Sequence, residues 1–441
     1  MPEKPENVFE TVFVLGLDDH NLAILEKLPD AGRYRFLPLL TIEKLQYRDE
    51  IPVPELLDEA QRQVESFDGP VHAIIGFWDF PVSSMVPILC RRLGLRWPSL
   101  ESVVKCEHKY WSRLEQREVI DEYPRFGLVD LDASEVELPE GLRYPVWLKP
   151  VKAFSSELAF HVEDPEQLRE AAAAIREGIG RVGEPFSFVL DQLDLPPEMA
   201  DVGGSACLAE EESVGAQVTV EGYSHGGDVH VYGVVDSVTC PDSPSFLRYQ
   251  YPSRIPAQVS DRMIDISRRV IRRIGLHDAT FNIEYFWDAD RDVIRLLEVN
   301  PRHSQSHAEL FERVDGLANH DCMLQLALGR EPRLPHREGE HAVAAKWFLR
   351  RTEDGVVTRV PTAQEIAQVE RDVPGCTVDV IVAHGDRLSE LHDQDSYSYK
   401  IANIYVGAQD EQELTRRYER CVAGLPFEFA EEESAEGEES E

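Results

Sequence analysis

The chain lacks any apolar run of about 18 residues, the length that a membrane-spanning helix requires. Its first ten residues are rich in Pro and Glu instead of basic and then apolar, so we expect no secretory signal. The 7 cysteines are scattered and never form a CxxC pair, which is typical of reduced thiols and argues against a disulfide framework or a zinc site. Together these absences predict a cytoplasmic protein without a membrane partner.

Positive charge is also scarce, with 45 Lys and Arg against 82 Asp and Glu and a net charge of −37. Such an excess repels phosphate backbones, which argues against a nucleic-acid partner. Few of the basic residues are lysines, yet Lys105, Lys109, Lys149 and Lys152 fall close together. This cluster favours an anion-binding role, although ordinary salt bridges would explain it as well.

The N-terminal third alternates apolar runs with helical patterns, which predicts a small parallel α/β layer. Its apolar runs are 8–17, 35–40 and 71–77. The first run is followed by Gly16-Leu-Asp-Asp-His and not by GxGxxG, so a nicotinamide-dependent oxidoreductase is disfavoured. A helical segment is expected from about 98 to 118.

Beyond residue 100 the pattern mixes strands and helices, which indicates an α+β region. We expect domains at 1–100, 101–332, with a small subdomain at about 140–215, and 336–430, the last rich in β-strands after a Pro-rich stretch. Residues 431–441 hold many Glu and no apolar anchor, so a disordered acidic tail is expected.

Two strand-like runs, 280–287 and 293–300, carry carboxylates among apolar residues. Because side chains alternate across a strand, a hairpin of these runs would bring Glu284, Glu298 and Asn300 to one face. Two carboxylates and an amide oxygen suit Mg²⁺, and Arg302 follows at a distance that allows phosphate contact. A hairpin with solvated polar residues would show the same spacing, but the apolar neighbours favour the metal site.

In their order along the chain, these motifs resemble the ATP-grasp superfamily over about residues 98–330. The pair NIEYFW and LLEVNPR is similar to the family's metal-binding strands, and YPVWLKP and LAEEESVGAQVTVEG resemble its phosphate strand and adenine hinge. The resemblance implies an ATP-grasp fold with a Rossmann-like pre-grasp domain. It also implies ATP and Mg²⁺, or Mn²⁺, as cofactors.

The same resemblance assigns roles by position. Glu284, Glu298 and Asn300 are implied as metal ligands, and Arg302 as the catalytic arginine. The nucleotide would contact the following residues: Lys109 and Lys149 at the phosphates, Glu210, Glu211 and Ser213 at the adenine, and Gln217 at the ribose.

Two positions depart from the family pattern. The phosphate loop 150–157 contains no Gly, so hydroxyl donors such as Ser156 would replace backbone contacts. The sequence does not decide whether this loop closes over the phosphates. Ser306 stands where biotin carboxylases typically place a Glu. His303 and His307 lack a third ligand at suitable spacing, so a substrate contact or a polar loop is favoured over zinc.

The sequence therefore predicts a ligase that joins a small, amino-acid-like carboxylate to an amine through an acyl phosphate, with release of ADP and phosphate. Two alternatives remain: a carboxylase resembling biotin carboxylase, and a nucleotide-binding regulator without catalysis. Neither the substrate pair nor the oligomeric state follows from the sequence, although relatives often form homodimers.

Overall fold

The computed structural model describes residues 9–153, 157–241, 243–391 and 397–430. The predicted acidic tail and Ser156 lie outside this part of the chain. Contacts divide the chain into two compact units. Unit 1 comprises Met1–Asp236, Ser253–Ala308 and Leu317–His336, and unit 2 comprises Ser237–Pro252, Glu309–Gly316 and Arg337–Glu441. The division into two units does not test the finer domain boundaries expected from the sequence, which stay a prediction.

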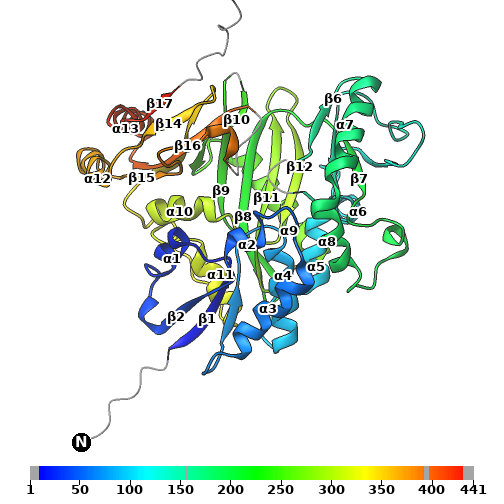
Figure 1. Cartoon of the computed structure of the whole chain (residues 1–441), viewed down its shortest axis with the longest axis horizontal. Coiled ribbons are helices and arrows are strands. Elements are labelled where there is room, and N and C mark those ends of the chain that lie inside the picture. The colour runs from blue at the N-terminus through cyan, green and yellow to red at the C-terminus, as the bar shows by residue number, and fades with distance from the viewer. Residues whose placement is uncertain (1–8, 154–156, 242, 392–396, 431–441) are drawn as a thin grey trace, which may run out of the picture. The chain divides into compact units, whose positions relative to one another are not determined.

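Unit 1 begins with the α/β layer that the sequence predicts (Figure 1). A parallel sheet in the order β2-β1-β3 contains β1 (Glu10–Leu15), β2 (Tyr34–Leu39) and β3 (Ala73–Ile75). The central strand is almost wholly buried, which explains its continuous apolar sequence. Four helices connect and follow these strands: α1 (Asp19–Leu25), α2 (Ile42–Leu45), α3 (Val53–Glu65) and α4 (Val82–Leu93).

The helical segment expected at 98–118 is two helices, α5 (Leu100–Glu107) and α6 (Lys109–Arg117). His108 separates them because its backbone leaves the helical region, with φ −81° and ψ 98°. Its side chain then caps α6 by accepting a hydrogen bond from the Trp111 amide at 3.3 Å. The break places Lys109 in the first turn of α6, where its side chain can turn toward the site.

An antiparallel sheet in the order β4-β7-β5-β6 follows, built from β4 (Phe126–Val129), β5 (Val146–Pro150), β6 (Phe160–Val162) and β7 (Cys207–Glu211). Helix α7 (Pro165–Gly178) starts at Asp164, which accepts hydrogen bonds from two amides of the first turn. It buries Leu168 and Ile175 against Val146 and Leu148 of the sheet. Helix α8 (Gly180–Leu190) completes this part.

The remaining strands of unit 1 pair in the order β12-β11-β8-β9. They are β8 (Ala216–His225), β9 (Asp228–Cys240, whose last residues belong to unit 2), β11 (Ala279–Asp288) and β12 (Val293–Asn300). Helix α9 (Ala257–Ile274) buries Met263, Val270 and Ile271 in a core with Phe281 and Ile283. Helix α11 (His320–Ala327) also lies in unit 1. The side of the hairpin that is not used for this core carries the polar residues of the site.

Unit 2 is rich in strands, as the sequence predicts for the C-terminal region. Its main strands pair antiparallel in the order β10-β13-β16-β15, with β10 (Ser243–Tyr251), β13 (Val343–Arg351), β16 (Tyr399–Ala408) and β15 (Cys376–Val380). A second pair joins β14 (Val356–Arg359) to β17 (Glu428–Ala430). The helices are α10 (Ala308–Asp315), α12 (Ala363–Asp372) and α13 (Glu411–Ala423). Across the described residues of both units, no helix is long and apolar enough to cross a membrane.

Candidate active site

The predicted hairpin of β11 and β12 is confirmed, and its register sets the centre of the site. Glu284 lies directly opposite Glu298, and Asn282 lies opposite Asn300. A bulge follows Glu284, between it and Tyr285. Two carboxylates facing each other across a pair of strands repel, so this arrangement is unfavourable unless a cation lies between them.

The charge of the carboxylate pair is uneven. Burial and the neighbouring charge of Glu298 raise the pKa of Glu284 to about 7. Burial acts in the same direction on Glu298, but the charges of Lys109, Lys149 and Lys152 outweigh it and lower the pKa of that carboxyl. The pair is therefore a strong acceptor for a cation.

Gln217, which the resemblance places at the ribose, contacts Glu284 of the proposed metal-binding pair, and its contact with a ribose stays a prediction. Its amide nitrogen donates to Glu284 at 2.8 Å from the neighbouring strand β8. This hydrogen bond orients the carboxylate and favours its ionised form.

Asn300 is buried at the end of β12 and oriented by a second amide. Its nitrogen donates to the side-chain oxygen of Asn282 at 2.9 Å, and the Asn282 nitrogen donates to the Arg302 carbonyl at 3.1 Å. Because the Asn300 nitrogen is used in this way, the amide is oriented with its oxygen available as an acceptor. Two carboxylates and this oxygen fit a hard divalent cation, with positions left for phosphate oxygens.

The two histidines of the loop after β12 are buried and contact residues of neighbouring strands. His307 is buried and shares a hydrogen bond of 2.9 Å with Glu221, which also accepts from the Ser304 amide at 3.1 Å. His303 is buried beside Thr280. Among the described residues, no group of three or more His, Cys, Asp or Glu side chains could hold a metal ion. The histidines fix the loop that follows Arg302.

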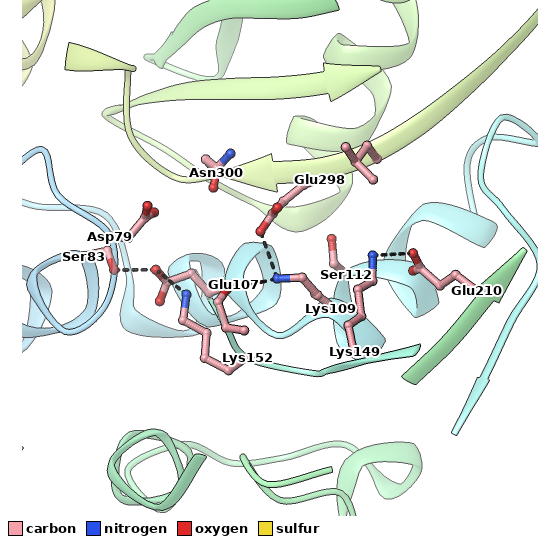
Figure 2. A network of polar contacts seen from close by, with 12 residues as sticks. Asp79, Ser83, Glu107, Lys109, Ser112, Lys149, Lys152, Glu210, Glu298 and Asn300 are labelled. Atoms are coloured by element: carbon pink, nitrogen blue, oxygen red, sulfur yellow. Dashed lines mark hydrogen bonds and ion pairs between the residues drawn. The ribbon is translucent and has the colours of Figure 1, made fainter. Parts of the chain in front are cut away.

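Lys109 reaches across to Glu298 of the β11–β12 hairpin (Figure 2). Its ammonium donates to Glu298 at 3.1 Å and to the carbonyl of Ala153 at 3.2 Å. The second contact joins α6 to the start of the phosphate loop. The predicted phosphate lysine thus lies between the loop and a proposed metal ligand, although the sequence did not indicate its pairing with Glu298.

Lys149 lies on β5 and bonds to Glu210 of β7 at 2.6 Å, as Figure 2 shows. Glu210 also accepts from Arg113 of α6 at 2.7 and 3.3 Å. All three side chains are buried, with the glutamate between two cations. Burial would raise the pKa of Glu210, but Arg113 and Lys149 lower it to about 2.

Lys152 forms a third buried cation at the site. It pairs with Glu107 at 3.3 Å, and both side chains are at most 4% exposed. Ser83 and Ser84 donate to the two oxygens of that glutamate. The scarcity of Lys in the chain was the sequence signal for this residue, but its partner on α5 was not predictable.

Arg302 follows β12 and is bound by a carboxylate from a distant part of unit 1. Its Nε donates to one oxygen of Asp79 at 2.9 Å and its Nη2 donates to the other at 2.7 Å. Asp79 follows β3, at the carboxyl end of a parallel strand, where ligands of α/β layers commonly bind. Its position just after a predicted parallel strand is the sequence signal for this residue.

The residues predicted at the adenine are placed around the end of β7. The amide of Glu211 donates to the Arg125 carbonyl at 2.9 Å, and its side chain pairs loosely with Arg125 at 3.7 Å. Ser213 is half-buried in the turn before β8. The structure shows these positions, while their contact with a nucleotide stays a prediction, as does any contact of Ser156.

Comparisons with known proteins agree with this architecture. Residues 142–308 match the family described as ATP-grasp domain. The L-amino acid ligase from Bacillus licheniformis superposes with a TM-score of 0.69 at 14% identity, covering 96% of this chain and 99% of that one. The biotin carboxylase domain of the Hydrogenobacter thermophilus 2-oxoglutarate carboxylase, solved with MgADP and bicarbonate, gives a TM-score of 0.62 at 12% identity and coverages of 96% and 91%.

A curated relative is the uncharacterized protein y4rH of Sinorhizobium fredii, which is 23% identical over 322 residues. That match spans 71% of this chain but only 60% of the relative's length. The β11–β12 hairpin, strand β5 and strands β7 and β8 all fall inside the matched region of the family. The chain therefore contains an ATP-grasp domain and has the ATP-grasp fold, with a Rossmann-like layer before it and a β-rich C-terminal region.

Proposed function

We propose that the protein is an ATP-dependent carboxylate–amine ligase that works through an acyl phosphate. The observation that carries this proposal is the pairing of Glu284 with Glu298 across the hairpin, with Lys109 bound to the second carboxylate. A carboxylate pair able to bind a metal ion and a cationic partner beside it are what phosphoryl transfer needs, because this reaction depends on positioning and charge neutralisation.

The proposed reaction has two steps. A carboxylate oxygen of the first substrate attacks the γ-phosphorus of ATP, the bond to the β,γ-bridging oxygen breaks, and ADP leaves. The nitrogen of the amine then attacks the acyl carbon and loses a proton, while inorganic phosphate departs with the electron pair of the acyl–oxygen bond. The products are an amide, ADP and phosphate.

The residues of the chain divide this work. Glu284, Glu298 and Asn300 would hold Mg²⁺, which supplies neutralisation of phosphate charge when bound. Lys109 and Lys149 would donate to phosphate oxygens, and Arg302 would stabilise charge on the acyl phosphate. Each of these three cations has a carboxylate partner in the structure, so substrate binding exchanges one anionic partner for another.

A carboxylase that acts on biotin is the first alternative, and the structural likeness to a biotin carboxylase domain supports it. Ser306 counts against it, because a hydroxyl cannot serve as the carboxylate base expected at that position. A regulator that only binds nucleotide is the second alternative, supported by the glycine-free loop 150–157. Simple nucleotide binding does not require Arg302, so its preserved placement favours catalysis. Homodimer formation and a cytoplasmic location stay predictions.

The test is a matrix of small carboxylates and amines scored by phosphate release with MgATP. Glu298→Ala serves as the blank, and Asp290→Ala, in the exposed turn of the same hairpin, is the matched control. We expect turnover with at least one pair, near-complete loss in the blank and full activity in the control. Biotin-dependent release with bicarbonate would favour the carboxylase, and ATP binding without any turnover would favour the regulator.

A further inference from the structure

Asp79 is presented to the site by a loop that other residues hold in place. The indole nitrogen of Trp78 donates to the Gly16 carbonyl at 2.8 Å. The Gln46 amide donates to the carbonyls of Asp79 and Phe80 at 3.2 and 3.0 Å. Phe80 itself is fully buried. The loop is thus fixed without help from the Asp79 carboxylate, so the contact with Arg302 is not needed to hold this backbone.

The carboxylate of Asp79 stays partly accessible and ionised. Its side chain is 29% exposed, whereas that of Arg302 is 16% exposed. Burial acts to raise the pKa of Asp79, but the charges of Arg302, Lys152 and Lys109 outweigh it and lower the pKa. Figure 2 shows the carboxylate on the side of the network where Asn300 ends β12. A fixed negative charge therefore faces the place where the proposed reaction needs an anionic substrate.

This placement is unfavourable for a substrate that carries only negative charge. The fork of Arg302 already donates through Nε and Nη2 to Asp79, and its Nη1 donates to the His303 carbonyl at 3.2 Å. A simple carboxylate would compete with Asp79 for the guanidinium and be repelled by it. A zwitterion has the opposite property, because its ammonium gives Asp79 a new partner while its carboxylate takes up Arg302.

We propose that Asp79 and Arg302 form a receptor for an α-amino acid, with Asp79 accepting the ammonium and Arg302 contacting the carboxylate that is phosphorylated. This inference rests on the proposed ligase function and specifies its carboxylate substrate. Lys152 adds a positive charge that acts on Asp79. It is buried against Glu107 and lies over the rings of Phe80 and Phe186 at 5.7 and 5.8 Å. Its charge keeps Asp79 ionised when Arg302 turns to the substrate.

The receptor predicts a preference that wild-type protein alone can reveal. Each amino acid is paired with the carboxylic acid that lacks its amino group, for example alanine with propionate, and bicarbonate is included. Hydroxylamine serves as a common nucleophile that traps acyl phosphates, and ADP release is measured. We expect kcat/KM to be about 100-fold or more higher for the amino acid of a productive pair, since the analogue has no ammonium to pair with Asp79 when its carboxylate takes up Arg302.

Asp79→Asn tests the residue itself, with Asp290→Asn as the matched control in an exposed turn. The variant should raise KM for the amino acid at least about tenfold and reduce the preference over the des-amino acid. Its MgATP affinity, measured by calorimetry, should match that of wild type, which shows that it is folded.

Three results would decide against the inference. Equal use of amino acids and des-amino acids by the wild type would overturn it and leave the ligase proposal standing. An unchanged preference in Asp79→Asn would do the same. Release of ADP that no carboxylate stimulates would remove the ligase proposal and this inference together.

Discussion

Replacement of Glu210 by Gln should destabilise unit 1 strongly at neutral pH. The Glu210 side chain is 3% exposed and serves two buried cations, Arg113 and Lys149. A fall in the pKa of this carboxyl from 4.5 to about 2 corresponds to about 3 kcal/mol in the free energy of unfolding, since each tenfold change in proton affinity is worth about 1.4 kcal/mol. Glutamine keeps the shape of the side chain but leaves two positive charges without their anion.

The two partners do not gain equally from this contact. Burial lowers the pKa of Lys149 even though Glu210 acts to raise it, because Arg113 and Lys109 add repulsion. The one carboxylate, which contacts both cations, therefore gains more electrostatic stabilisation from the contact than either cation does. We therefore expect Glu210→Gln to lower the free energy of unfolding by about 2 to 3 kcal/mol. The lower value applies if solvent or a relaxed Lys149 compensates for the lost carboxylate.

The assay is urea unfolding followed by tryptophan fluorescence, which reports mainly on unit 1 because five of the 6 tryptophans lie there. The depressed pKa means that the stabilisation is complete above pH 4.5 and is lost as the pH falls through about 2. The difference between wild type and variant should therefore be constant from pH 7 to 5 and shrink below that.

The neighbouring substitution Glu211→Gln is the control. Its partner Arg125 has a side chain that is 71% exposed, and the contact is 3.7 Å, so the variant should lose less than about 0.5 kcal/mol. A Glu210→Gln variant that unfolds like this control at pH 7, or whose deficit does not shrink in acid, would refute the reasoning.

Three further predictions concern metal binding, packing and acid stability. Gln217→Leu removes a hydrogen bond to Glu284, a proposed metal ligand, and should weaken activation by Mg²⁺ about 10–100-fold in a titration of phosphate release. Gly204→Ala should lower the melting temperature markedly, because its Cβ would lie 2.3 Å from the Gly183 carbonyl, while Gly203→Ala, whose Cβ meets no atom nearer than 3.7 Å, should not. Burial lowers the pKa of His108 from 6.5 to about 3, so the free energy of unfolding should fall below pH 6.5 by about 1.4 kcal/mol per pH unit from this group. His108→Asn, which keeps a capping side chain, should flatten that part of the pH profile.

Much of the local structure followed from the sequence because it depends on short-range patterns. The alternation of apolar and polar residues predicted β11 and β12, and with it the face shared by Glu284 and Glu298. Helix α7 begins at another local signal, an Asp164 cap followed by Pro165 at the first helical position. The break between α5 and α6 was missed, because the helical pattern continues through His108 and only its backbone angles end the first helix.

The sequence by itself determined the β11–β12 hairpin, strand β5 and the order in which they occur, since each lies within a short segment whose spacing fixes its geometry. Only the tertiary structure decided which charges meet. Asp79 and Arg302 are separated by 223 positions, and Lys109 and Glu298 by 189. No local sequence pattern predicts such pairs, because they form only when the α/β layer, helix α6 and the hairpin pack into one unit. Burial then makes each ionised group require a partner of opposite charge.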